Sequence, residues 1–321
     1  MTEFELIERY FRDGCQRGSK RKDVLFGIGD DAAILRAPDN NQLVVTTDTL
    51  VEGIHFLKDI DPKVLAYKSV AVNLSDLAAM GADPAWLTLA LTLPKSDEAW
   101  LAGFAEGLNQ ICEYYGIALV GGDTTRGPLT ITLTAMGHVP SDRGIYRHGA
   151  NPGDWIFVTG TLGDSAAGLK LLTGDLSCDE DLKEFLVTKH LRPVPRVLAG
   201  RSLRGIASAC MDLSDGLAGD IKHICKASEV SAHINIEQLP LSSALQQALG
   251  EANAQSLAIV GGEDYELLFT VPENRKGALM TALGEAGVNH SCIGQMRGGS
   301  GVHFYRDGEL VTDLVDSFQH F

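Results

Sequence analysis

Six short clusters restrict the fold of this sequence most, because each sets acidic residues among Gly, Ser or Thr at the edge of an apolar run. They are Gly29-Asp30-Asp31, Thr46-Thr47-Asp48, Leu74-Ser75-Asp76, Gly121-Gly122-Asp123-Thr124-Thr125, Asp212-Leu213-Ser214-Asp215-Gly216 and Gly261-Gly262-Glu263-Asp264. The sequence has no G-x-x-x-x-G-K-[ST] phosphate-binding loop. Carboxylates and hydroxyls gathered without such a loop indicate hard cations that bridge to a polyphosphate.

The composition is that of a globular protein, with 45% hydrophobic and 21% charged residues, and 321 residues predict about two domains. The formal net charge of −15 argues against a nucleic-acid partner, which would require clustered Lys and Arg. The same charge fits either a protein that recruits divalent cations or simply an acidic cytosolic one. The six cysteines form no C-x-x-C motif, so we interpret them as reduced thiols.

The two segments most relevant to targeting predict no membrane partner. Met1–Phe11 has the pattern of an acidic amphipathic helix rather than a signal peptide. Leu74–Leu93 is the most apolar stretch, but two Asp, one Gly and one Pro interrupt it, so it cannot cross a bilayer. We therefore expect a soluble, cytoplasmic protein.

Strand-like and helix-like runs alternate along the chain, which predicts an α/β fold. In the first half we expect strands at Gln42–Thr47, Trp86–Leu93, Ala118–Val120 and Thr130–Val139, and helices at Pro62–Met80 and Ser96–Tyr115. In the second half we expect strands at Trp155–Thr159, Ala209–Met211, Ala232–Ile236 and Glu266–Val271, and helices at Ser165–Leu172, Leu217–Ala227 and Arg275–Ala286. The Gly- and Pro-rich segment Pro140–Gly153 is a connection, which predicts domains at 1–150 and 151–321.

Each acidic cluster taken singly also has an ordinary structural explanation. Asp30 and Asp31 suit a solvated Gly turn, and the Gly121-Gly122-Asp123 segment is expected to be a turn between strands. Ser214 or Asp215 could cap the helix that follows. Asp76 is the sharpest case, because an ionised acid in a nearly apolar helix is costly unless it is paired or metal-bound. Six such explanations holding together is less probable than one common site for phosphoryl transfer, which depends mainly on positioning and charge neutralisation.

Read in order, these clusters resemble the motifs of the thiamine-monophosphate kinase family, within the aminoimidazole-ribotide-synthetase-like (PurM-like) superfamily. The resemblance rests on Gly27-Ile28-Gly29-Asp30-Asp31, Thr47-Asp48-Thr49, Asn73-Leu74-Ser75-Asp76-Leu77-Ala78-Ala79-Met80-Gly81-Ala82, Gly121-Gly122-Asp123-Thr124-Thr125, Asp212-Leu213-Ser214-Asp215-Gly216 and Gly261-Gly262-Glu263-Asp264-Tyr265-Glu266-Leu267. It runs from about residue 4 to the C-terminus. The resemblance implies a two-domain PurM-like architecture in which a β-rich N-terminal domain binds ATP and Mg²⁺ and pairs in a homodimer. A C-terminal α/β domain would complete the metal and substrate site.

The activity that the resemblance implies is ATP-dependent phosphorylation of thiamine monophosphate to thiamine diphosphate, the last step in the synthesis of that cofactor, with several Mg²⁺ ions. The implied Mg²⁺ ligands are Asp31, Thr46, Thr47, Asp48, Asp76, Asp123, Asp212 and Asp215. The implied ATP contacts are Gly122, Asp123, Arg147 and Ser214, and the implied substrate contacts are His55, Glu263 and Phe318. No side-chain nucleophile is expected. The chain departs from the family at its end, where Ser317-Phe318-Gln319-His320-Phe321 replaces the usual Gly-aromatic-x-His-Phe.

Two other functions remain open at this point. One is a superfamily ATPase that makes a different activated phosphate, although a hydrogenase-maturation protein would end in Cys and this chain ends in Phe321. The other is a non-enzymatic module that senses a nucleotide or a cation. Release of ADP on addition of thiamine monophosphate, but not of thiamine, separates the three.

Overall fold

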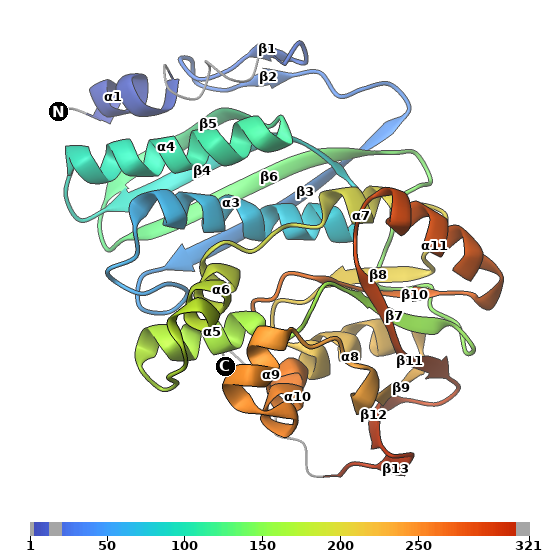
Figure 1. Cartoon of the computed structure of the whole chain (residues 1–321). Coiled ribbons are helices and arrows are strands. Elements are labelled where there is room, and N and C mark those ends of the chain that lie inside the picture. The colour runs from blue at the N-terminus through green and yellow to red at the C-terminus, as the bar shows by residue number, and fades with distance from the viewer. Residues whose placement is uncertain (1–2, 13–20, 313–321) are drawn as a thin grey trace. The chain divides into compact units, whose positions relative to one another are not determined.

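The computed structural model describes residues 3–12 and 21–312. The chain forms two compact units: the N-terminal unit comprises Met1–Leu77 and Ala82–Asp142, and the C-terminal unit comprises Ala78–Gly81 and Arg143–Phe321. Each unit combines a sheet with helices (Figure 1), which confirms the predicted mixed α/β class.

The main sheet of the N-terminal unit has four strands in the order β3-β6-β4-β5, with β4 and β5 parallel and the other neighbours antiparallel. These strands are β3 (Asn41–Val51), β4 (Asp83–Leu93), β5 (Ala118–Arg126) and β6 (Thr130–Pro140). Helices α3 (Pro62–Ala79) and α4 (Glu98–Tyr115) lie along one face of this sheet (Figure 1). The remaining elements are α1 (Glu3–Leu6), the π-helical turn η1 (Ile7–Arg12), and a two-stranded sheet of β1 (Val24–Phe26) and β2 (Ile34–Leu35).

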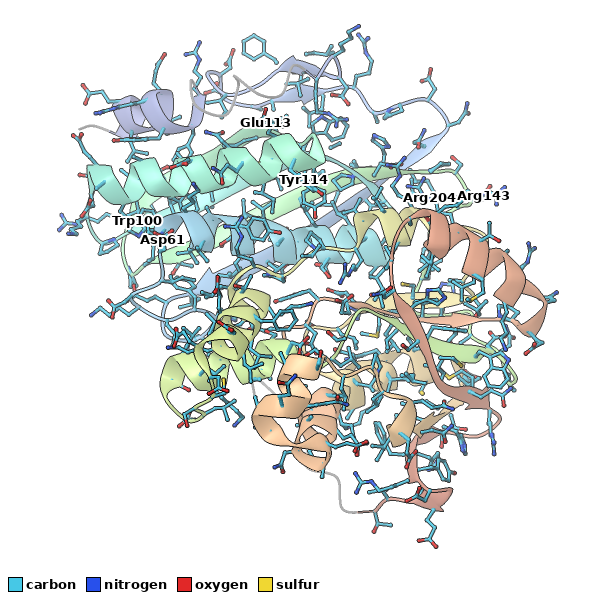
Figure 2. All side chains as sticks on the ribbon, viewed as in Figure 1. Asp61, Trp100, Glu113, Tyr114, Arg143 and Arg204 are labelled. Atoms are coloured by element: carbon cyan, nitrogen blue, oxygen red, sulfur yellow. The ribbon has the colours of Figure 1, made fainter. Side chains whose placement is uncertain are left out.

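Local capping sets the ends of the two helices. The carboxylate of Asp61 (labelled in Figure 2) accepts hydrogen bonds from two N–H groups in the first turn of α3, which begins at Pro62 as predicted. Gly81 follows the end of this helix with φ +67°, and Gly116 closes α4 with φ +66°. The predicted helix over Ser96–Tyr115 begins later than expected: Asp97 is the cap of α4, and its carboxylate accepts from the first-turn N–H groups.

The C-terminal unit contains a seven-stranded sheet in the order β13-β12-β9-β11-β7-β10-β8, in which only the β12–β9 pair is parallel among the described strands. Its strands are β7 (Trp155–Thr159), β8 (Ala209–Asp212), β9 (Ser231–Asn235), β10 (Leu267–Val271), β11 (His290–Arg297), β12 (Gly301–Arg306) and β13 (Glu309–Leu310). Its helices are α5 (Asp164–Thr173), α6 (Glu180–Leu191), α7 (Val197–Ser202), α8 (Leu217–Ser228), α9 (Ser243–Leu249), α10 (Glu251–Val260) and α11 (Lys276–Glu285), with 3₁₀ turns η2 (Ile236–Gln238) and η3 (Glu273–Arg275).

Two expectations about elements are corrected. The Gly121-Gly122-Asp123 segment is not a turn: β5 continues through it to Arg126, paired with β4. The strand accommodates this because its register shifts near Leu87 and because Gly122, at φ +154°, allows the backbone to approach the Leu89 carbonyl closely. Neither Ser214 nor Asp215 caps α8, whose cap residue is Gly216 without a side-chain hydrogen bond.

No helix in the described part of the chain is both long enough and apolar enough to span a membrane.

Candidate active site

The N-terminal unit brings together three of the predicted metal ligands. Thr46 and Asp48 occupy alternate positions on β3, so their side chains share one face of the strand, and Asp76 projects from α3. The Thr46 hydroxyl donates a 2.5 Å hydrogen bond to Oδ2 of Asp76. Burial, reinforced by the nearby Asp76 carboxylate, raises the pKa of Asp48 to about 6. Two crowded carboxylates and a hydroxyl are hard oxygen donors of the kind that Mg²⁺ prefers.

The structure does not bring the Thr47 hydroxyl into this group. Thr47 lies between Thr46 and Asp48 on the strand and therefore points to the opposite face. There its hydroxyl is 2.9 Å from that of Thr134, and Thr49 makes the same contact with Thr132. A sequence motif read as three neighbouring donors is thus divided between two faces of a sheet.

Asp31, Gly122 and Asp123 line one cavity of about 680 Å³ within the N-terminal unit. Its lining also includes apolar side chains of η1 and β5. Asp31 and Asp123 are both exposed. A Cβ atom at Gly122 would lie 1.9 Å from the Leu89 carbonyl oxygen, so only glycine fits where the strand borders this cavity.

His55 lies in the loop after β3, where its Nδ1 accepts a 3.1 Å hydrogen bond from the Val51 N–H. An imidazole that accepts at Nδ1 carries its proton at Nε2 when neutral. The local fold therefore fixes both the ring orientation and the tautomer of this predicted substrate contact.

In the C-terminal unit, the predicted sites at 212–215 and 263 lie on two loops that pack closely. The Glu263 N–H donates to the Ser214 carbonyl at 2.7 Å, and the Tyr265 N–H donates to the Leu213 carbonyl at 2.9 Å. A Cβ atom at Gly262 would lie 2.5 Å from the Ser214 carbonyl oxygen, which explains the glycine next to Glu263. Asp212 is buried at the end of β8, opposite Leu267 of β10.

Asp220 supports the 212–216 loop and was missed by the sequence reasoning. It is buried in the first turn of α8, and its Oδ2 accepts a 3.0 Å hydrogen bond from the Asp215 N–H. Burial raises the pKa of Asp220 to about 7, while the positive charge of Arg147 acts in the opposite direction. An acid within the string Leu217-Ala218-Gly219-Asp220-Ile221 was the available signal. Arg147 itself is exposed.

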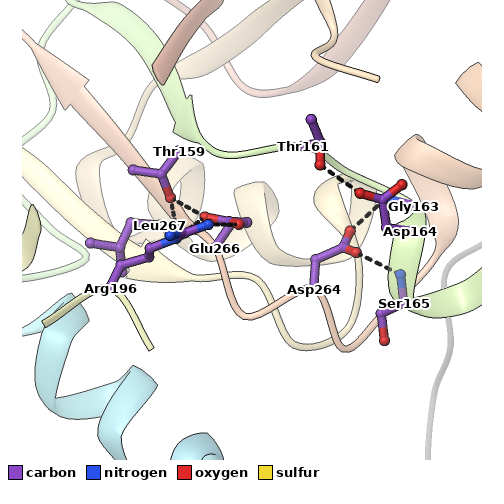
Figure 3. Close-up of polar contacts among 9 residues, drawn as sticks. All are labelled: Thr159, Thr161, Gly163, Asp164, Ser165, Arg196, Asp264, Glu266 and Leu267. Carbon is purple, nitrogen blue, oxygen red and sulfur yellow. Dashed lines mark hydrogen bonds and ion pairs between the residues drawn. The ribbon is translucent and has the colours of Figure 1, made fainter. Parts of the chain in front are cut away.

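Glu263 occupies an unusual backbone conformation. Its φ is +65°, and Tyr265 has φ +50°, although neither is a glycine. Between them, the Asp264 carboxylate accepts backbone hydrogen bonds from Gly163 at 2.7 Å and Ser165 at 3.2 Å, at the start of α5 (Figure 3). Glu263 Oε2 is 3.3 Å from Nδ1 of His190, a buried residue of α6. Such left-handed non-glycine residues are typical of functional loops held by their surroundings.

Within residues 3–12 and 21–312, no three His, Cys, Asp or Glu side chains lie close enough together to hold a metal ion by themselves. The Thr46–Asp48–Asp76 group brings predicted ligands together and includes a hydroxyl. Phe318, the predicted aromatic contact, lies outside the described residues.

The chain is similar to known proteins along its whole length. The family described as AIR synthase related protein, N-terminal domain, matches residues 29–139, and its C-terminal domain matches residues 151–307. A thiamine-monophosphate kinase from Salmonella typhimurium (strain LT2) is 54% identical over 321 residues, covering 99% of this chain and 98% of the relative. The chain belongs to the thiamine-monophosphate kinase family. This membership confirms the two-domain AIR-synthase-related architecture and the family suggested by the motifs.

Two solved structures of the family resemble the whole chain. The thiamine-monophosphate kinase from Stenotrophomonas maltophilia has a TM-score of 0.87 and 44% identity, covering 97% of this chain and 98% of that one. The structure of AaThiL complexed with AMPPCP and TMP has a TM-score of 0.79 and 35% identity, covering 100% of this chain and 99% of that one. The second complex contains the two ligand types that the sequence analysis expected for this family.

Proposed function

We propose that the protein transfers the γ-phosphoryl group of ATP to thiamine monophosphate, forming thiamine diphosphate and ADP. Family membership at 54% identity over the whole length supports this reaction. The observation in the molecule that carries it is the Thr46–Asp48–Asp76 group, where a 2.5 Å hydrogen bond and a raised Asp48 pKa mark crowded, partly buried oxygen donors. Two partly buried carboxylates in such a group destabilise the fold unless a cation balances their charge. A cation that also binds phosphates would do so.

We propose several Mg²⁺ ions as these cations, and their candidate ligands together are Asp31, Thr46, Thr47, Asp48, Asp76, Asp123, Asp212 and Asp215. Since the Thr47 hydroxyl faces away from Thr46 and Asp48, Thr47 would contribute to their group through its main-chain oxygen. When bound, Mg²⁺ neutralises the repulsion between the two anionic phosphates.

The remaining candidate contacts divide between the two substrates. We assign Gly122, Asp123, Arg147 and Ser214 to ATP, since a bare glycine backbone and a guanidinium suit phosphate oxygens. We assign His55, Glu263 and Phe318 to thiamine monophosphate. Glu263 supplies a carboxylate for the positively charged thiazolium or the aminopyrimidine of thiamine.

No side-chain nucleophile is required, because the acceptor is a phosphate monoester whose second pKa is about 6. Its oxygen is already charged at neutral pH, so direct in-line transfer is the simplest path. A phosphorylated side chain, trapped after incubation with ATP alone and identified by mass spectrometry, would overturn this mechanism.

We also propose a homodimer that forms through the N-terminal unit. β3 is an edge strand of the four-stranded sheet, and its outward face presents Leu43 and Val45, which are 54% and 52% exposed. An exposed apolar strand face of this kind indicates an interaction surface, and a second copy of the same face is the self-complementary partner. Light scattering should show a dimer, and Leu43→Glu together with Val45→Glu should shift it to a monomer.

The reaction is tested by coupled detection of ADP with ATP and a panel of acceptors. Thiamine monophosphate should give ADP and thiamine diphosphate in equal amounts, whereas thiamine, thiamine diphosphate and unrelated phosphomonoesters should give neither. Release of ADP without formation of thiamine diphosphate would favour an ATPase of the same superfamily that makes a different activated phosphate. Nucleotide binding without ADP release under any condition would favour a sensing module.

A further inference from the structure

Three residues of the loop that carries Glu263 hydrogen-bond to neighbouring segments of the C-terminal unit. The N–H groups of Glu263 and Tyr265 donate to the carbonyls of Ser214 and Leu213, and the Asp264 carboxylate accepts from two N–H groups at the start of α5. The cap residue of α5, Gly163, has no side chain, so Asp264 supplies from a distant loop the acceptor that a helix start needs. These bonds fix the loop backbone, but they do not fix the Glu263 side chain.

Contact with α6 orients that side chain. His190 is 4% exposed, and its Nδ1 is 3.3 Å from Glu263 Oε2 and 3.1 Å from the Ser165 hydroxyl oxygen. An unprotonated Nδ1 would point its lone pair at the carboxylate and repel it, whereas a protonated Nδ1 can donate a hydrogen bond to it. The carboxylate therefore favours a proton at Nδ1, and the Ser165 hydroxyl lies within hydrogen-bond distance of the same nitrogen.

The burial of the two partners differs in a way that suits a positioning role. The His190 side chain is buried, whereas the Glu263 side chain is 27% exposed. A buried ring on a helix is held in place by its surroundings, and the Glu263 side chain that it contacts is itself partly exposed. Holding one oxygen reduces the rotamer freedom that binding a ligand would otherwise remove.

We propose that His190, supported by Ser165, positions the Glu263 carboxylate for the thiamine moiety of the substrate. This inference rests on the proposed function, and in particular on Glu263 as a contact of thiamine monophosphate. It adds two positioning residues that neither touch the reacting phosphates nor belong to the acidic clusters. Thiamine monophosphate affinity should therefore depend on His190, while ATP affinity should not.

Four variants test the role. His190→Leu removes the donor and should raise the Kd for thiamine monophosphate about tenfold. His190→Asn places an amide N–H near the position of Nδ1 and should restore the Kd to within about threefold. Ser165→Ala should weaken binding about threefold, since the ring keeps only one of its two Nδ1 contacts. Glu184→Gln, on the exposed side of the same helix, is the matched control and should change nothing.

Binding is measured by calorimetry for thiamine monophosphate and for a non-hydrolysable ATP analogue, with thermal unfolding followed on the same samples. A double-mutant cycle separates positioning from general packing. If His190 acts through Glu263, adding His190→Leu to Glu263→Gln should change nothing, so the Glu263→Gln variant and the double variant should have the same Kd within about twofold. Independent effects that multiply in the double variant would overturn the proposal. An equal loss of ATP affinity in His190→Leu, or no rescue by His190→Asn, would also overturn it.

The failure of the proposed function is recognised separately. If the wild type binds thiamine monophosphate but releases no ADP, the proposed reaction is wrong and the cycle still decides the role of His190. If the wild type does not bind thiamine monophosphate at all, both proposals are wrong. If it phosphorylates thiamine monophosphate and His190→Leu leaves its Kd unchanged, only the positioning role is wrong.

Discussion

The Thr46 hydroxyl and the Asp76 carboxylate are joined by a 2.5 Å hydrogen bond across 30 residues of sequence. Asp76 lies in α3, whose neighbouring residues Asn73, Leu74, Ser75 and Leu77 are buried, so a strand donor compensates for the cost of an acid there. Asp48, on the same face of β3 as Thr46, has a pKa raised to about 6, mainly by burial and additionally by Asp76. The helix and the strand thus build one oxygen-rich group inside the N-terminal unit.

Asp76→Asn should lower turnover by about 100-fold or more, because it removes a charge from the proposed metal ligands. It should lower the melting temperature little, since an amide oxygen still accepts from Thr46. Turnover at saturating Mg²⁺ and thermal unfolding check both expectations, with the exposed Asp59→Asn as control. Unchanged turnover would remove Asp76 from the metal site.

Gly107 in α4 should be intolerant of a methyl group. A Cβ atom there would lie 2.1 Å from the Lys63 carbonyl oxygen of α3, so Gly107→Ala forces the two helices apart. Overpacking of this kind costs about 1–3 kcal/mol. Gly284→Ala in α11 is the matched control: nothing lies within 4 Å of its Cβ position, and the substitution should stabilise by up to about 1 kcal/mol. Denaturant unfolding of both variants measures the difference, and equal effects would contradict the steric reason.

Sequence patterns predicted helices and strands correctly where the apolar periodicity and the residues at both ends agreed. Trp155–Thr159 forms β7 with the expected bounds, and α4 ends at Tyr115, the predicted last residue, where Gly116 caps it. Helix α6 was missed because it presents only Leu186 and His190 to the core, too few for a periodic signal. The acid in the apolar helix was identified correctly as a residue that needs a partner, whereas the identity of the partner depended on the fold.

The side-chain contacts at the candidate site that the sequence could not predict depend on the three-dimensional fold. Thr46, Thr47 and Asp48 are consecutive, yet strand alternation separates Thr47 from the other two, which follows only once β3 is known to include all three. Contacts between Glu263 and His190, or between Asp264 and the start of α5, join segments about 70 to 100 residues apart. No periodicity or capping signal specifies such pairs.

Asp264 predicts a pH dependence of stability. Burial raises the pKa of this carboxyl from 3.8 to about 8 in the folded protein, although two backbone hydrogen bonds oppose the shift. Between these two values the folded state holds a proton that the unfolded state has lost, so stability falls as pH rises through that window. Asp264→Asn cannot titrate, so the melting temperature of the wild type minus that of the variant should decrease from pH 5 to pH 9. Parallel curves for the two proteins would show that Asp264 does not titrate in this range.

The ion pair of Arg196 and Glu266 should be a strong determinant of stability in the C-terminal unit. The guanidinium Nε is 2.6 Å from Oε2 and Nη2 is 2.5 Å from Oε1, and the Thr159 hydroxyl donates to Oε2 at 2.6 Å (Figure 3). The side chains are 21% and 5% exposed, so Arg196→Met leaves a poorly hydrated carboxylate and should cost about 3–5 kcal/mol.

Adding Glu266→Gln to Arg196→Met removes the uncompensated charge while keeping an acceptor for Thr159, and should recover about 1–3 kcal/mol. The control is Lys183→Met, whose ion pair with Glu180 is exposed and should contribute less than about 1 kcal/mol. Urea unfolding of these three variants and the wild type gives the free energies. A double variant that is less stable than Arg196→Met alone would mean that Glu266 stabilises the fold through its other contacts, and not through the ion pair.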